Sequence, residues 1–124
     1  MLNISSGVDL IEIDRVIQAI DRHGDRFLKR VFTPQELAEL KGNPASLAGR
    51  FAAKEAVAKA LGTGIGQVAW QEIEILRGPA REPVLHLNGM AAELAAQKNL
   101  TSWSVSLSHT QTLAIAAVFA AGQT

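Results

Sequence analysis

The fold is decided by the stretch RFAAKEAVAKAL, residues 50–61, near the middle of the chain. Apolar residues, most of them alanine, occupy almost every direction around a helical wheel of this segment, which is typical of a buried helix. We expect the helix to start at Ser46, to cover residues 47–61 and to stop at Gly62. It is then the longest helix of the molecule.

Four charged side chains lie on this otherwise apolar helix. Arg50 and Lys54 are four residues apart, and so are Glu55 and Lys59. Such spacing can reflect surface interactions worth about 0.2–0.5 kcal/mol each. Charges on a buried helix, however, need partners. This favours the alternative that Glu55 is an oxygen ligand and that the basic side chains face an anion.

The residues before the long helix predict one strand and several short helices. Residues 2–11 read as a strand, and apolar residues at helical spacing follow from Ile13 to Ile20. Gly24 should end or bend this helix, and residues 25–31 add a further helical turn. Thr33 and Glu36 have the spacing of a capping box, which predicts another short helix that ends at residues 42–44.

The residues after the long helix predict strands. Alternating or β-rich patterns cover residues 70–76, 83–87 and 103–108, with a helix over 90–98. The stretch Leu113–Ala121 is apolar without alternation, which is typical of a strand buried on both faces. One of these faces is a candidate subunit interface. The predicted class is α+β, with a mainly antiparallel sheet wrapped on one long central helix.

Composition narrows the possible functions. The 124 residues fit one domain, 1–124, and the formal net charge of zero argues against bulk binding to nucleic acid or a membrane. The absence of cysteine excludes disulfides and thiolate catalysis. With neither a leader pattern nor an apolar run of about 18 residues, we expect a cytoplasmic protein. Alanine accounts for 20 of the apolar residues and only 39 are bulky, so an oligomer that buries more surface is plausible.

Asp9 and Glu55 are candidate metal ligands. Asp9 follows Gly7-Val8 where the first strand is expected to run out, and its alternative role is to cap the next helix. Two carboxylates suit Mg²⁺, which is commonly held by one or two carboxylates, water and substrate phosphates. The chain has no HExxH motif and no cysteine cluster, so zinc is not expected.

Two further segments carry weaker signals. The glycine-rich loop, residues 62–66, could let the backbone approach a phosphate, although a helix C-cap followed by a turn is the simpler interpretation. His109 ends an alternating strand, and a lone histidine is more often structural than catalytic.

Basic residues gather on one side of the first helical region. If Gly24 does not rotate the second half, they lie within about 100° of one another on a helical wheel. This basic strip is either a solvated face or a docking surface for an acidic partner helix. It consists of Arg15, Arg22, Arg26, Lys29 and Arg30.

Four segments together resemble one family, holo-acyl-carrier-protein synthase, the small bacterial type of phosphopantetheinyl transferase. They follow the order of that family over almost the whole chain, and the central one is the most specific. One departure is Arg81-Glu82-Pro83, where the family often has Gly-Lys-Pro; we expect no effect from this turn. The segments are Gly7-Val8-Asp9, Phe32–Leu37, Arg50–Gly66 and Ser106–Thr110.

The resemblance implies transfer of 4′-phosphopantetheine from coenzyme A to a serine of apo-acyl carrier protein, in support of fatty acid biosynthesis. It also implies a homotrimer with active sites between subunits. A serine that arrives on the partner would explain why the chain shows no nucleophile of its own. The base that removes its proton is left open between Glu55 and a metal-bound water, with His109 less favoured. A non-catalytic coenzyme-binding module and a purely structural oligomer are the competing classes.

The resemblance assigns roles to individual positions. Asp9 and Glu55 match the Mg²⁺ ligands and the catalytic residues. Arg15, Arg22, Arg26 and Arg30 match the surface that receives the carrier protein. Positions near the coenzyme are matched by Arg50, Lys54, Lys59, Gly62, Thr63, Gly64, Ile65, His109 and Thr110.

Overall fold

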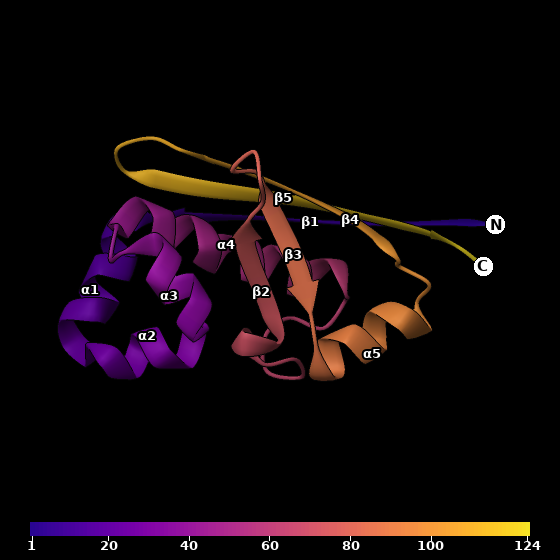
Figure 1. Ribbon diagram of the computed structural model, residues 1–124, viewed down its shortest axis with the longest axis horizontal. Coiled ribbons are helices and arrows are strands. Elements are labelled where there is room, and N and C mark those ends of the chain that lie inside the picture. The colour runs from indigo at the N-terminus through magenta and orange to yellow at the C-terminus, as the bar shows by residue number, and fades with distance from the viewer.

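A long sheet lies across one side of the molecule, and the helices lie beneath it (Figure 1). The computed structural model describes all 124 residues. In chain order the elements are β1 (Leu2–Glu12), α1 (Ile13–His23), α2 (Asp25–Val31), α3 (Pro34–Leu40), α4 (Pro44–Ala60), the 3₁₀ helix η1 (Trp70–Glu72), β2 (Ile73–Arg77), β3 (Pro83–Leu87), α5 (Gly89–Gln97), β4 (Ser102–His109) and β5 (Leu113–Gln123).

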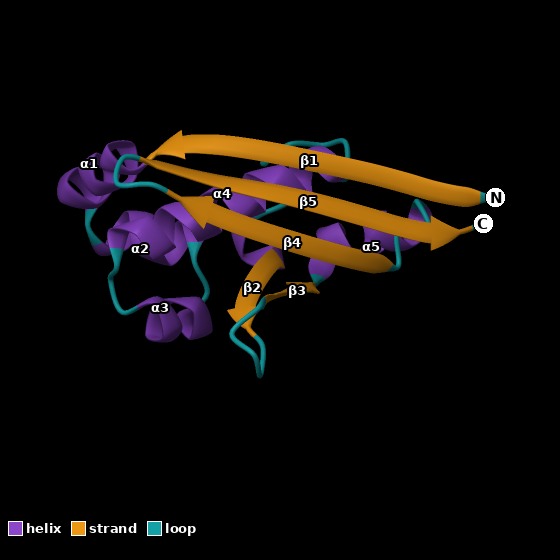
Figure 2. Ribbon diagram, turned by 90° about the horizontal axis from the view of Figure 1, so that it is seen from above, coloured by secondary structure: helices purple, strands orange, loops and turns teal.

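The strands form two antiparallel sheets rather than the single sheet expected. Strands β1, β5 and β4 lie side by side in that order (Figure 2). The first and last strands pair along their whole length, from Leu2 opposite Gln123 to Glu12 opposite Leu113. Strands β2 and β3 pair only with each other, as a separate hairpin. The α+β class is therefore confirmed.

Helix α4 packs directly against the inner face of the three-stranded sheet. Of the 24 buried apolar residues, 11 are alanines, so the helix and strand backbones approach each other closely. Gly7 shows how close: a side chain there would place its Cβ atom 1.9 Å from the carbonyl oxygen of Ala56. Only glycine fits at this point of β1, which explains the Gly7-Val8-Asp9 segment in structural terms.

The helix boundaries follow local capping signals. Thr33 and Glu36 form the predicted capping box, with the Thr33 N–H donating to Glu36 Oε1 at 2.9 Å. Helix α4, however, begins at Pro44 and not at residue 47. Asn43 caps it by accepting the Ser46 N–H at 3.0 Å, and Pro44 suits the first turn because it has no N–H to satisfy. Gly24, with φ 54°, separates α1 from α2.

The structure corrects one strand prediction and bears on a second. Residues 70–72 form η1, so the strand expected over 70–76 starts only at Ile73. Strand β5 alternates: Ala114, Ala116, Val118 and Ala120 are buried, whereas Phe119 on the other face is 55% exposed. In the single chain only one face of β5 is buried, and the other is the face predicted as a candidate subunit interface.

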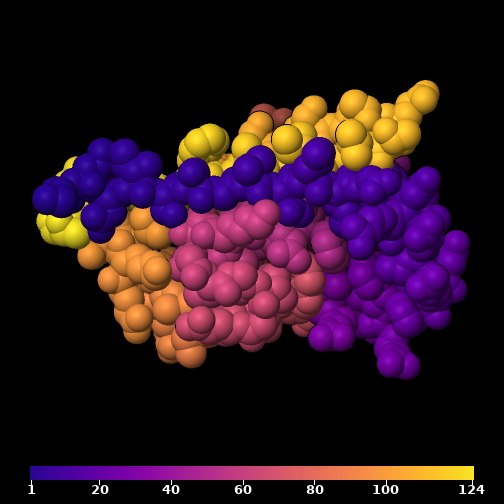
Figure 3. Space-filling model, turned by 180° about the vertical axis from the view of Figure 1, so that it is seen from behind, coloured from indigo at the N-terminus to yellow at the C-terminus, as the bar shows by residue number.

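The exposed side of the sheet is strongly apolar. In register with one another, β1 and β5 present a continuous surface, which we call the outer apolar face. Figure 3 shows β1 along the edge of the sheet, above the helices. The large apolar side chains of this face are Leu2, Ile4, Val8, Leu10, Leu113, Ile115 and Phe119.

The helices of the structure are too short or too polar to span a membrane.

Candidate active site

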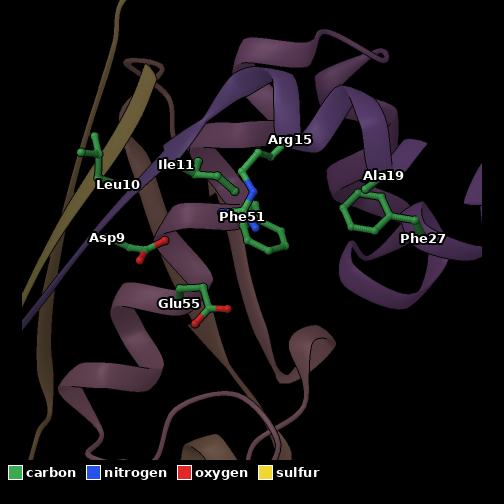
Figure 4. Close-up of a pocket in the computed structure, with 8 residues that line it drawn as sticks. All are labelled: Asp9, Leu10, Ile11, Arg15, Ala19, Phe27, Phe51 and Glu55. Carbon is green, nitrogen blue, oxygen red and sulfur yellow. The ribbon is translucent and has the colours of Figure 1, made fainter. Parts of the chain in front are cut away.

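A hollow of about 410 Å³ lies between β1 and helices α1, α2 and α4 (Figure 4). Two carboxylates line it, Asp9 from β1 and Glu55 from α4. Arg15 adds a positive charge, and Phe27 and Phe51 are among the apolar residues of the wall. The structure therefore brings together the two acids predicted as metal ligands, although 46 positions of sequence separate them.

Asp9 reaches the hollow because it lies on the inner face of β1. Ser5 and Gly7 share this face, and the Ser5 hydroxyl donates to the Ala60 carbonyl at the end of α4 at 2.6 Å. Strand β1 continues past Asp9 to Glu12, and Glu12 takes the N-cap position of α1. The alternative role of Asp9 as a helix cap is therefore wrong.

Lys59 pairs with Asp9 and not with the Glu55 of its own helix. Its Nζ atom lies 3.1 Å from Asp9 Oδ1 and donates to the Val8 carbonyl at 2.9 Å. The Lys59 side chain is 51% exposed, whereas Asp9 is 20% exposed. Lys59 thus fixes the β1 carboxylate and leaves positive charge accessible beside it.

The Glu55 carboxylate lies where negative charge is unfavourable. Burial raises its pKa, the neighbouring Asp9 carboxylate raises it further, and Lys59 acts in the opposite direction. A cation between the two acids would relieve both effects. No cluster of three or more histidine, cysteine, aspartate or glutamate side chains is present. The two-carboxylate donor set nevertheless fits Mg²⁺, whose remaining ligands are usually water and substrate phosphates.

Lys54 faces protein groups and lines neither this hollow nor the one around Arg50, so its position gives no support to the predicted contact with the coenzyme. It is fully buried, with its Nζ atom 2.8 Å from Glu36 Oε1. The same atom donates to the Trp70 carbonyl at 3.0 Å and to the Ile73 carbonyl. Burial lowers the Lys54 pKa, and Glu36 opposes this shift. All three ammonium donors are therefore used to join α3, η1 and β2 to α4.

Arg50 lines a second hollow, of about 260 Å³, in which three guanidinium groups converge. Its neighbours there include Arg77, Arg81 and His109. Arg50 Nε is buried without a hydrogen-bond partner. Burial lowers the Arg50 pKa, and the positive charge of Arg77 lowers it further. Glu39, whose carboxylate lies 3.9 Å from Arg77 Nε, offsets part of this charge. Three guanidinium groups around one hollow still suit an anion.

Sequence reasoning missed Arg77 and Arg81. Both belong to the β2–β3 hairpin, and Arg81 lies in the turn for which we expected no effect. No spacing rule connects this hairpin to α4, because only tertiary packing brings it to Arg50.

The glycine-rich loop and the His109 segment lie outside the hollow of Asp9 and Glu55. The Thr63 and Gly64 N–H groups donate to the Ala58 carbonyl, so the loop closes the end of α4, as the simpler interpretation predicted. Gly62 and Gly64 have positive φ, and Ile65 lines a separate hollow of about 460 Å³ together with Lys29 and Arg30. His109 and Thr110 are exposed where β4 ends.

The basic strip is divided between two helices. Gly24 changes the chain direction, so the assumption of one uninterrupted helix is wrong. Arg15 lines the hollow of the two acids, whereas Arg26 and Arg30 line a small hollow with His23. Arg22 is exposed near the end of α1, and the other three arginines are exposed as well.

Comparison with known proteins identifies the family. A sequence model of the 4′-phosphopantetheinyl transferase superfamily matches residues 5–118. A Herpetosiphon aurantiacus protein named holo-[acyl-carrier-protein] synthase is 48% identical over 124 residues, which cover 94% of this chain and 98% of that protein.

Solved structures agree. The Helicobacter pylori holo-[acyl-carrier-protein] synthase, solved in complex with coenzyme A, is 35% identical with a TM-score of 0.85, covering 93% of this chain and 98% of that one. The Bacillus anthracis synthase, solved in complex with CoA (3′,5′-ADP), is 30% identical with a TM-score of 0.81. The match covers 99% of this chain and 100% of that one. The chain therefore belongs to the 4′-phosphopantetheinyl transferase superfamily and is an enzyme of its holo-[acyl-carrier-protein] synthase family.

Proposed function

We propose that the chain transfers the 4′-phosphopantetheine group of coenzyme A to a serine of an apo-acyl carrier protein. The serine oxygen bonds to the phosphorus that carries the pantetheine while the pyrophosphate bond breaks, and adenosine 3′,5′-bisphosphate leaves. The observation that carries this proposal is the convergence of Asp9 and Glu55 in one hollow beside Lys59 and Arg15. The coenzyme complexes of the Helicobacter and Bacillus relatives support coenzyme A as the substrate.

Asp9 and Glu55 would hold Mg²⁺ against the pyrophosphate. When bound, the ion supplies positive charge that stabilises the negative charge developing on the leaving bisphosphate. Lys59 keeps Asp9 in place and adds positive charge of its own. Of the two side chains considered as bases for the serine proton, Glu55 lies in this hollow and His109 does not.

The coenzyme phosphate outside the pyrophosphate would be held by basic groups and backbone away from the metal site. Arg50, with its unpartnered Nε, is placed to bind a phosphate in the second hollow. The loop residues Gly62, Thr63, Gly64 and Ile65, and the pair His109 and Thr110, stay predicted coenzyme contacts. Within one chain these groups line different hollows, so a site completed by a second subunit accounts for them best.

The outer apolar face supports the same proposal of a homotrimer. It leaves Phe119 55% and Val8 55% exposed in the single chain. Contiguous exposed apolar surface of this kind commonly marks an interaction site.

The arginines of the basic strip would receive the acidic carrier protein. A role in fatty acid biosynthesis and a cytoplasmic location are expectations from the family resemblance.

One incubation tests the reaction. The protein is mixed with coenzyme A, Mg²⁺ and apo-acyl carrier protein, and the carrier is analysed by mass spectrometry. We expect the carrier to gain one phosphopantetheinyl group, and we expect a chelator to prevent this. Glu55→Gln should keep the fold and lose most turnover. An unmodified carrier together with bound coenzyme would indicate a coenzyme-binding module, and wild-type kcat in Glu55→Gln would refute the metal assignment.

A further inference from the structure

The short helix η1 connects two parts of the molecule that carry different proposed roles. On one side, the Lys54 ammonium of α4 donates to the Trp70 carbonyl at 3.0 Å. On the other side, the next residue, Gln71, donates through Nε2 to the Phe32 carbonyl at 3.0 Å and to the Lys29 carbonyl. Lys29 belongs to α2 and Phe32 is its C-cap. Helix η1 thus ties the end of α2 to the helix that carries Glu55.

Helix α2 needs such an anchor. It has 7 residues, and isolated helices shorter than about 12–15 residues are marginal in water. The last carbonyls of a helix also lack partners within it. The Lys29 carbonyl would ordinarily accept from the Thr33 N–H, but that group donates to Glu36 Oε1 at 2.9 Å instead. The Gln71 amide supplies the missing donor.

The orientation of α2 matters because this helix carries three of the five residues of the basic strip, two of them arginines. Arg26 and Arg30 belong to α2, and Arg15 and Arg22 belong to α1. Gly24, with φ 54° and ψ −132°, interrupts the helix between them. Helical continuity therefore cannot fix the two pairs of arginines relative to each other, and the contacts of α2 with its neighbours must do so.

We infer that Gln71 is a positioning residue for carrier docking: it holds α2 so that Arg26 and Arg30 meet the same acidic partner as Arg15. Gln71 itself need not touch the carrier. This inference rests on the proposed function, because the partner is the acyl carrier protein.

The test replaces the amide donor with an apolar group of similar length. Gln71→Met should raise the KM for carrier protein about two- to tenfold, the range expected for loss of one hydrogen-bonded anchor. The kcat should change less than the carrier KM, because Gln71 itself does not line the hollow of Asp9 and Glu55. The KM for coenzyme A should also rise less than the carrier KM; an equal rise would mean that Gln71 acts through the hollow it shares with Ile65 and would overturn the inference. Amide hydrogen exchange in α2 should become faster. Gln71→Lys keeps a donor at this position and should restore slow exchange.

The matched control is Gln67→Met, at an exposed glutamine whose side chain makes no hydrogen bond. An unchanged carrier KM in Gln71→Met, or an equal rise in Gln67→Met, overturns the inference. Unchanged exchange in α2 overturns it as well. If the wild-type protein modifies no carrier, the proposed function fails. In that case, the Kd of apo-carrier protein is compared between wild type and Gln71→Met. A higher Kd in Gln71→Met, together with faster exchange in α2, still supports a positioning role for Gln71, and an equal Kd overturns it.

Discussion

Replacing Lys54 with methionine should destabilise the protein strongly. Methionine has nearly the same length but no ammonium group. Glu36, which is fully buried, would keep the N–H groups of Thr33 at 2.9 Å and Ile75 at 3.0 Å but lose the Lys54 ammonium at 2.8 Å. The carbonyls of Trp70 and Ile73 would lose a donor at the same time.

The size of the effect follows from this geometry. Removing one partner of a buried ion pair costs about 3–5 kcal/mol, because the other charge stays buried and uncompensated. For a chain of 124 residues, an unfolding entropy of about 2.1 cal/mol/K per residue gives about 0.26 kcal/mol/K. A loss of about 4 kcal/mol then lowers Tm by about 15 °C.

Thermal unfolding followed by circular dichroism, at one fixed protein concentration, measures the fall in Tm, and urea unfolding measures the loss of free energy. The double variant Glu36→Gln/Lys54→Met removes both charges and should recover at least half of the loss, since no buried charge is left alone. Lys98→Met, at an exposed lysine, is the control and should change stability little. The reasoning is refuted if Lys54→Met is as stable as wild type, or if the double variant is no more stable than the single one.

Three other predictions concern different parts of the structure. Because the pKa of the Glu55 carboxyl is raised, the metal-free folded protein binds the Glu55 proton more tightly than the unfolded chain does. The free energy of unfolding therefore falls as pH rises through the raised pKa. Metal-free Glu55→Gln should therefore melt at a higher temperature than wild type near neutral pH, and a gap that persists on acidification would contradict this. Arg15→Glu should raise the KM for carrier protein, and added salt should raise the wild-type KM in the same way; a KM insensitive to both would exclude docking there. Gly7→Ala should lower stability by about 3 kcal/mol, near the top of the usual range for overpacking, because its Cβ would clash with the Ala56 carbonyl. Gly49→Ala on α4, where an added Cβ would meet no atom of another segment within 4 Å, should not lower stability in the same denaturation assay and should raise it by up to about 1 kcal/mol, because alanine favours the helix over glycine.

Features with a local signal could be predicted from the sequence. The capping box at Thr33 and Glu36, the end of α1 at Gly24 and the alternation of β4 depend on residues only a few positions apart. Asp9 and Glu55 could be singled out as candidate ligands because a charge within an apolar strand or on an apolar helix needs a partner.

Features that depend on tertiary contacts could not be predicted in this way. Lys54 and Glu55 are adjacent in the sequence, yet one is fully buried against Glu36 and the other lines an open hollow. A charge pattern alone cannot tell a ligand-facing base from a structural one. Arg77 likewise reaches the Arg50 hollow only because the β2–β3 hairpin folds back toward α4.

The close contact between α4 and the sheet has a consequence for the precision of the site. Where Gly7 faces Ala56, the spacing is set by main-chain atoms and alanine methyl groups, neither of which has rotamers to change. Asp9 and Glu55 project from these same two segments. The separation of their Cα atoms is therefore insulated from side-chain fluctuations in the core. The two carboxylates proposed to share one small ion are thus carried by segments whose spacing is set by main-chain atoms.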